Sequence, residues 1–193
     1  MSSKMWAALA MALWAVPALV APMGVVAQEG DRIYLPIGSE APALEGVAID
    51  GAFYSLRGML AEGPVFLIFW NDPCGHNPAA IPLINSLTDA YQGKARLLGV
   101  VVSSVEGAKV WQEDFQPHHP VIVDPPGRWI DAYEMVYSVV PMKVGTDGRI
   151  ADVYDGYGQI ELQRLNEAMA AVAGLPVADI DLSEAPERHP FYG

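Results

Sequence analysis

The chain has 193 residues, of which 11 are basic, 23 are acidic and one is a cysteine, so its formal net charge is −12 at pH 7. An excess of acidic residues this large argues against nucleic acid or an anionic membrane as a partner, because both carry negative charge themselves. The single cysteine excludes a disulfide within the chain, so Cys74 is expected to be either buried and inert or exposed and used.

The first 27 residues are expected to be a signal peptide. Lys4 supplies a positive charge, residues 5–21 are apolar, and Val25-Val-Ala27 has the small residue that a signal peptidase accepts. An uncleaved membrane anchor is the alternative, because the apolar run approaches the length that spans a bilayer. The protein is therefore expected to be exported, with a bacterial periplasm as its compartment and no stable membrane insertion once the signal is removed.

After a polar leader at 28–37, residues 38–174 are expected to form one domain. Continuous apolar runs predict buried strands, and apolar residues spaced by three or four positions predict helices. The predicted elements, in chain order, are a hairpin within 44–54, strand 65–70, helix 78–91 with a kink at Pro82, strand 95–103, helix 104–116, strand 121–124, helix 128–136, a hairpin of 142–145 with 149–154, and helix 160–173.

The order of these elements predicts the fold class. Strands that alternate with helices and end in an antiparallel pair indicate an α/β fold with a central mixed sheet flanked by helices. Gly174 and Pro176 end the last helix. The remaining segment, 175–193, is rich in proline and acidic residues and is expected to be an extended tail.

Cys74 follows the apolar strand and precedes the helix that starts near Pro78. Backbone N–H groups and the positive end of the helix dipole favour a thiolate at such a position, so a reactive thiol is expected, with an inert buried cysteine as the alternative. His76 could stabilise that thiolate or be a solvated loop residue. Asn77 could donate its amide to the sulfur or belong to the first helical turn without a chemical role.

Several motifs together resemble those of the thioredoxin-like superfamily. In chain order they are Gly38-Ser-Glu-Ala-Pro42, Phe69-Trp-Asn-Asp-Pro-Cys74-Gly75, Pro82, Tyr137-Ser-Val-Val-Pro141 and Gly145-Thr-Asp-Gly-Arg-Ile150. They are most similar to those of exported TlpA/ResA-type thiol–disulfide oxidoreductases and of the related redoxin (AhpC/TSA-like) group. The resemblance covers roughly residues 38–174. It implies a thioredoxin-like fold and an oxidoreductase with a part in cell redox homeostasis and antioxidant activity.

The resemblance also implies roles for two residues near the cysteine. Pro141 is expected to be the cis-proline that faces Cys74, since an X–Pro bond tolerates the cis form better than other peptide bonds. Val140 is expected to offer its backbone N–H and C=O to an extended substrate chain. Apart from the resemblance, Trp70 is expected to be a core or rim aromatic beside the active-site loop, and Trp70 and Pro73 are expected to contact the substrate there.

The chain departs from the family at its second active-site cysteine. The family's C-x-x-C reads Cys74-Gly-His-Asn77 here, so a mixed disulfide formed by Cys74 needs an outside thiol to resolve it. Peroxiredoxins carry a threonine three residues before their cysteine and a proline four residues before that threonine. Asn71 and Leu67 occupy these two positions, which disfavours a standard peroxiredoxin.

Two functions follow from the sequence. The first is a thiol–disulfide oxidoreductase that forms mixed disulfides through Cys74 alone, with a thiol- or disulfide-containing protein or a small thiol as partner and an external reductant. The alternative is a redox-inactive binding module of chaperone-like or metal-handling type. Cu(I) would suit a set of Cys74, His76, Met142 and either His118 or His119, but their spacing is not compact, so no metal and no cofactor are expected.

Overall fold

The computed structural model describes residues 34–188, so the predicted signal peptide and most of the predicted leader lie outside the described residues. Within that range, no helix is long and apolar enough to cross a membrane. The helices and strands are, in chain order, β1 (Glu45–Val47), β2 (Phe53–Ser55), α1 (Leu56–Leu60), β3 (Val65–Asn71), α2 (Asn77–Ala90), β4 (Arg96–Val102), α3 (Val105–Phe115), β5 (Val121–Val123), α4 (Arg128–Ala132), β6 (Val140–Val144), β7 (Ile150–Val153) and α5 (Gln159–Ala173).

A five-stranded mixed sheet with the order β5-β4-β3-β6-β7 forms the centre of this structure. Strand β3 pairs in parallel with β4 and antiparallel with β6, while β4 and β5 are parallel and β6 and β7 antiparallel. Strands β1 and β2 form a separate antiparallel hairpin. The predicted mixed sheet and both predicted hairpins are therefore confirmed.

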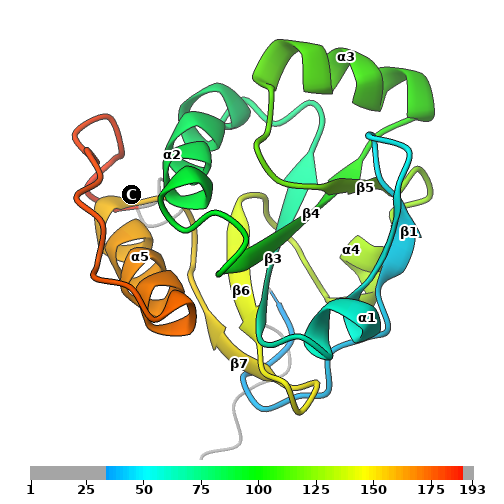
Figure 1. Cartoon of the computed structure of the whole chain (residues 1–193). Helices are drawn as coiled ribbons and strands as arrows, with labels where there is room; N and C mark the ends of the chain where they lie inside the picture. The colour runs from blue at the N-terminus through cyan, green and yellow to red at the C-terminus, as the bar shows by residue number, and fades with distance from the viewer. Residues whose placement is uncertain (1–33, 189–193) are drawn as a thin grey trace, which may run out of the picture. The chain divides into compact units, whose positions relative to one another are not determined.

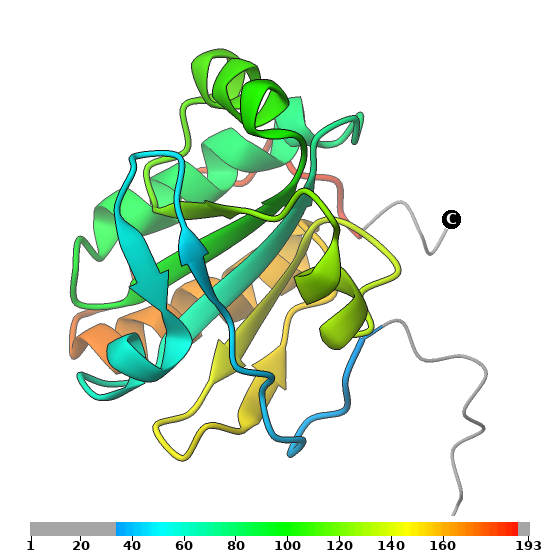
Figure 2. The same ribbon diagram turned by 90° about the vertical axis from the view of Figure 1, so that its right-hand side faces the viewer.

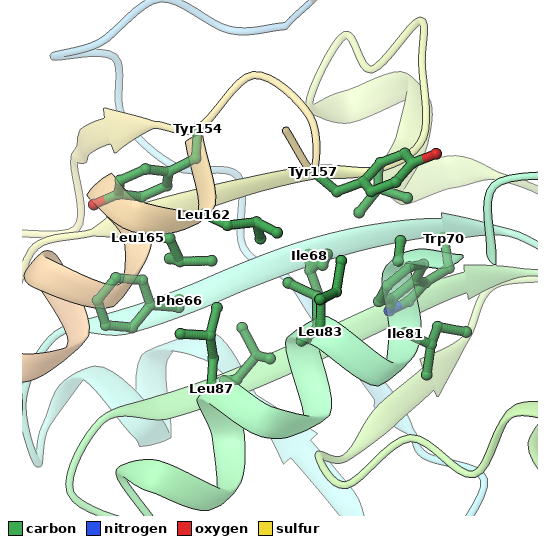
Figure 3. Packing of buried hydrophobic residues seen from close by; sticks show 14 of the residues in the cluster. Phe66, Ile68, Trp70, Ile81, Leu83, Leu87, Tyr154, Tyr157, Leu162 and Leu165 are labelled. Carbon is green, nitrogen blue, oxygen red and sulfur yellow. The ribbon is translucent and has the colours of Figure 1, made fainter. Parts of the chain in front are cut away.

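Strand β3 is buried on both faces of the sheet. Phe66, Ile68 and Trp70 face a core that α2, α3 and α5 complete, and Figure 3 shows side chains of α2 and α5 closing over this row. The alternate residues of β3 face a second core beneath the β1–β2 hairpin, α1 and α4, which lie on the other side of the sheet in Figure 2. Burial on both faces explains why β3 reads as one continuous apolar run.

Two short helices differ from the prediction. Helix α1 is absent from the predicted elements, yet it begins where the Ser55 hydroxyl accepts a hydrogen bond from the Gly58 N–H, a regular N-cap. Helix α4 ends at Ala132, four residues before the predicted end at 136, and Glu134 then adopts a left-handed conformation with φ of 53°. A backbone in that region cannot continue a right-handed helix, so the chain turns toward β6.

The described part of the tail docks against the domain, which the sequence left open. It runs back along α5 from the C-terminal toward the N-terminal end of that helix (Figure 1). The Asn166 amide donates to the Ala178 carbonyl at 2.8 Å, and the Ala178 N–H donates to the Tyr91 hydroxyl, also at 2.8 Å. The Tyr91 hydroxyl in turn donates to the Asn166 side-chain oxygen. A buried polar cluster therefore fixes the start of the tail.

Replacing Tyr91 by Phe is expected to lower the free energy of unfolding by about 1–3 kcal/mol, because the Ala178 N–H and the Asn166 oxygen both lose a buried partner. Urea unfolding followed by circular dichroism measures the change. The matched control is Tyr54→Phe, which removes only an exposed hydrogen bond to Asp50 and should stay within about 0.5 kcal/mol of the wild type. Equal losses in the two variants would contradict the role of the buried cluster.

Candidate functional site

Cys74 lies in the tight turn that joins the C-terminal end of β3 to α2. Its N–H donates to the carbonyl of Asn71, the last residue of β3, at 2.9 Å, and its own carbonyl accepts from the Asn77 N–H at 3.1 Å. The cysteine is free and only partly buried. The backbone around the sulfur is therefore fixed while the side chain is reached by solvent, which confirms the expected place of Cys74 between strand and helix.

The backbone donors at the start of α2 are already used, contrary to the sequence expectation. Asn77 donates its N–H to the Cys74 carbonyl, Pro78 has no N–H, and Ala79 and Ala80 both donate to the His76 carbonyl. None of these four residues therefore offers an N–H to the sulfur. The helix dipole still favours negative charge at this end.

Asn77 is fully buried and holds the turn together. Its amide nitrogen donates to the carbonyls of Asn71 at 3.0 Å and Asp72 at 3.2 Å. Both amide hydrogens are thus assigned to the backbone, so the proposed hydrogen bond from Asn77 to the Cys74 sulfur has no donor left. The side-chain oxygen of Asn77 is buried and accepts no hydrogen bond from the described residues. Asn77 belongs to the site as support for the turn.

Tyr157 is a site residue that the sequence reasoning missed. Its hydroxyl lies 3.0 Å from Nδ1 of His76, although the two residues are 81 positions apart, and their ring centroids are 5.6 Å apart. Burial, and next the charge of Cys74, raise the pKa of Tyr157 above its usual value. The phenol therefore lies in the electrostatic range of Cys74 as well as in contact with His76. Tyr157 lies at the opposite end of the apolar cluster from Tyr154 in Figure 3.

Nothing in the sequence around Tyr157 could have identified it. The residue lies in the short link between β7 and α5, where neither a strand nor a helix period applies. A tyrosine in such a link ordinarily packs in the core or lies at the surface without a functional role, so it carries no signal of a site. Only the packing of that link against the start of α2 brings Cys74, His76 and Tyr157 together.

The structure buries the side chains of three of the four predicted substrate contacts. Trp70 is fully buried, and its indole N–H donates to Nε2 of His119 at 3.4 Å. Val140 and Pro141 are the first two residues of β6, paired with Phe69 and Ile68 of β3, and the Pro141 carbonyl accepts from the Tyr154 N–H. The pairing of β6 with β7 begins at Met142, so no described strand pairs with Val140 on that side, and Val140 stays a predicted backbone contact for a substrate chain. Pro73, which is exposed beside Cys74, stays a prediction.

The cis peptide bond is also not where the sequence placed it. Among the described residues, the bond recorded as cis joins Ser138 and Val139, two residues before the predicted position. Pro141 instead lies within β6, where it is paired with Ile68 of β3. The prediction of a cis-proline at Pro141 is therefore wrong.

An apolar surface adjoins the turn that carries Cys74. A cavity of about 120 Å³ opens between Asn71 and Val102, at the C-terminal ends of β3 and β4, and the segment 135–138. Val136 and Tyr137 at its rim are 61% and 40% exposed. This exposed apolar surface meets the Cys74 turn at Asn71, the residue whose carbonyl accepts the Cys74 N–H.

The residues considered for Cu(I) do not come together. His118 forms an exposed pair with Asp89, His119 accepts the Trp70 N–H in the core, and Met142 is buried within β6. In the part of the chain that the structure describes, no group of three His, Cys, Asp or Glu residues is arranged to hold a metal ion.

Comparison with known proteins gives one family and one fold. A sequence model of the AhpC/TSA family matches residues 37–161. Among solved structures, a thiol:disulfide interchange protein DsbE from Chlorobium tepidum is similar with 20% identity and a TM-score of 0.64, over 72% of this chain and 99% of that one. Among curated proteins, none matches the sequence significantly.

Two further structures show the same fold. The thioredoxin domain of a thiol–disulfide oxidoreductase from Bacteroides vulgatus has 21% identity and a TM-score of 0.60, over 69% of this chain and 97% of that domain. The peroxidoxin BcpB from Mycobacterium tuberculosis has 17% identity and a TM-score of 0.58, over 72% of this chain and 96% of that one. The fold is therefore thioredoxin-like, as the sequence motifs implied.

Proposed function

Since this chain belongs to the AhpC/TSA family, we propose that it is a thiol–disulfide oxidoreductase that works through Cys74 alone. The observation that carries the proposal is the fixed, partly exposed Cys74 at the strand-to-helix turn, with a buried Asn77 three residues later. A thiol at this place is accessible for exchange. The residue that would otherwise resolve the mixed disulfide has no sulfur, so the protein stops at the one-cysteine stage.

The first step joins Cys74 to its partner. The Cys74 thiolate attacks one sulfur of a partner disulfide, a new S–S bond forms, the partner's S–S bond breaks, and the second partner sulfur leaves as a thiolate that takes up a proton. An external thiol then attacks the mixed disulfide and restores the Cys74 thiolate. The first thiol molecule is now bonded to the partner sulfur. A second molecule of the thiol attacks that bond, releases the partner thiol and forms the disulfide of the external thiol. Two electrons thus pass from the external thiol to the partner.

The side chains near the sulfur suit the first step. Burial, and next the charge of Cys74, raise the pKa of the Tyr157 phenol. A protonated phenol can donate a hydrogen bond to a thiolate, and the imidazole of His76 at 3.0 Å orients that phenol. We therefore assign thiolate stabilisation to the pair of His76 and Tyr157.

The proposed compartment is the one that the sequence indicates. A protein with an amino-terminal signal sequence is exported, and an oxidising compartment supplies the disulfides that Cys74 would attack. The partner is a disulfide-containing protein or a small disulfide, reached over the exposed apolar surface of Val136 and Tyr137.

Oxidised glutathione is the probe that tests the proposal. We expect the reduced full chain to gain one glutathione by mass spectrometry without denaturant, and an excess of reduced glutathione to remove it. The rate should follow the fraction of thiolate between about pH 4 and 10. Cys74→Ser should form no adduct. A wild-type chain that is modified only after unfolding would overturn the proposal and favour the redox-inactive binding module.

A further inference from the structure

The docked tail ends next to the link that carries Tyr157. At the N-terminal end of α5, the Gln159 N–H donates to the Pro186 carbonyl at 2.9 Å. The side-chain amide of the same residue donates to the Ala185 carbonyl at 3.0 Å. Gln159 therefore binds the tail through its backbone and its side chain together. The backbone bond also satisfies one of the N–H groups that the start of any helix leaves without an internal partner.

Only one residue separates Gln159 from Tyr157. Gly158, the N-cap of α5, has φ of −67° and ψ of 162° and is buried, so the link is extended at this point. On the other side of Tyr157, the N–H of Gly156 donates to the Tyr154 carbonyl at 2.9 Å. The link is thus fixed to β7 at one end and to the tail at the other. The Tyr157 hydroxyl projects from it to His76.

The tail has a second anchor of its own close to the site. Ala185 is only 4% exposed, and its N–H donates to the Leu182 carbonyl at 2.9 Å, which forms a turn before the contact with Gln159. Ile180 and Leu182 pack against the core that contains α2 and α5. This end of the tail is therefore held independently of the cluster around Tyr91 at the other end of α5.

We propose that residues 175–188 form a strap that holds Tyr157 against His76, and that Gln159 is a positioning residue that thereby sets the reactivity of Cys74. The proposal rests on the proposed function of Cys74 and adds to it the means by which the site is supported. Neither the strap nor Gln159 donates a group to the reaction. They act through the position of the phenol.

The effect of nearby charges on Cys74 has to be distinguished from the effect of the position of the Tyr157 phenol. Asp155 and Glu161 flank the link, and burial, followed by the charge of Glu161, raises the pKa of Asp155. The strap itself carries Asp179, Asp181, Glu184, Glu187 and Arg188. Carboxylates at the surface act on a thiolate through screened charge, so their influence should shrink between low and high salt. A change in Cys74 reactivity that comes from the position of the Tyr157 phenol should persist at high salt.

The test measures Cys74 labelling by iodoacetamide against pH in the full chain, at low and high salt. Gln159→Ala removes the side-chain contact with the strap, and Ala185→Lys places a long charged chain in a buried position. We expect both variants to raise the labelling midpoint by about half a pH unit and to slow labelling at pH 7 about threefold, at either salt concentration. Tyr157→Phe should raise the midpoint at least as far.

The matched control is Gln163→Ala, one turn further along α5, whose side chain bonds only Glu167 at the surface. It should leave the midpoint unchanged. A Gln159→Ala chain that loses thermal stability but keeps the wild-type midpoint would overturn the proposal, because the strap would then be structural only. If Tyr157→Phe shifts the midpoint and Gln159→Ala does not, the strap proposal fails while the role of Tyr157 in the proposed function stands.

Failure of the proposed function gives a different result. A wild-type chain that labels readily but never forms a disulfide with glutathione would refute mixed-disulfide chemistry, and the comparison of labelling midpoints would still decide whether the strap acts on Cys74. Gln159→Ala changes one partly exposed contact, so it keeps the proposal testable even if Ala185→Lys does not fold.

Discussion

Asn77→Cys is expected to turn a protein that depends on an external thiol to resolve its mixed disulfide into one that resolves it internally and reduces disulfides faster. The new sulfur stands three residues after Cys74, in the first turn of α2, where it can attack the mixed disulfide and release the partner. Turnover of a protein disulfide such as insulin, with dithiothreitol as electron donor, should rise at least about tenfold over the wild type. The increase in light scattering as insulin chains separate measures it.

The same substitution should also lower stability. The Asn77 amide donates to the carbonyls of Asn71 and Asp72, and a thiol replaces neither bond well, so we expect a loss of about 1–3 kcal/mol. Asn77→Ser is the matched control, since it removes the same amide and adds no sulfur. Equal turnover in the Cys and Ser variants would contradict the prediction and indicate that the site cannot place a partner disulfide near position 77.

Acid is expected to weaken the fold through His119. This residue is buried, its Nε2 accepts the indole N–H of Trp70, and its Nδ1 has no partner among the described residues. Burial, and next the charge of His118, lower the pKa of His119 from 6.5 to about 3. Below about pH 6.5 the unfolded chain therefore binds a proton that the folded chain refuses. Stability is lost as the pH falls through the interval from 6.5 to 3.

The size of this loss follows from the width of the interval. Between pH 7 and pH 5, His119 should reduce the free energy of unfolding by about 2 kcal/mol. Urea midpoints at the two pH values measure the change. His119→Gln keeps an acceptor for Trp70 and does not titrate, so its stability should depend less on pH by about that amount. The control is His118→Gln, at an exposed position paired with Asp89; if it flattens the pH dependence equally, His119 is not the cause.

Local sequence patterns predicted most of the helices and strands. The apolar run at 65–70 became β3 with one further residue, and the helix predicted at 78–91 became α2 at Asn77–Ala90. Each of these elements has a period, or a continuous run, that is visible within its own residues. Short elements were harder to predict. Helix α1 has only five residues, one of them a glycine, and α4 ends early because Glu134 leaves the helical region.

The sequence by itself determined the chemistry that Cys74 can perform. One thiol in the chain and an asparagine at position 77 leave no internal route to resolve a mixed disulfide, whatever the fold. The apolar strand before Cys74 and the helix after it likewise placed the sulfur at a strand-to-helix turn, and the structure confirms that position.

Only the tertiary structure decided which side chains surround that sulfur. Tyr157 reaches His76 across 81 positions, the strap returns to Gln159 from the far end of α5, and Trp70 points into the core rather than toward a substrate. None of these contacts has a period or a spacing in the sequence. They arise because the two faces of the sheet must both be covered, and the packing of α2, α5 and the tail over one face fixes which loops meet.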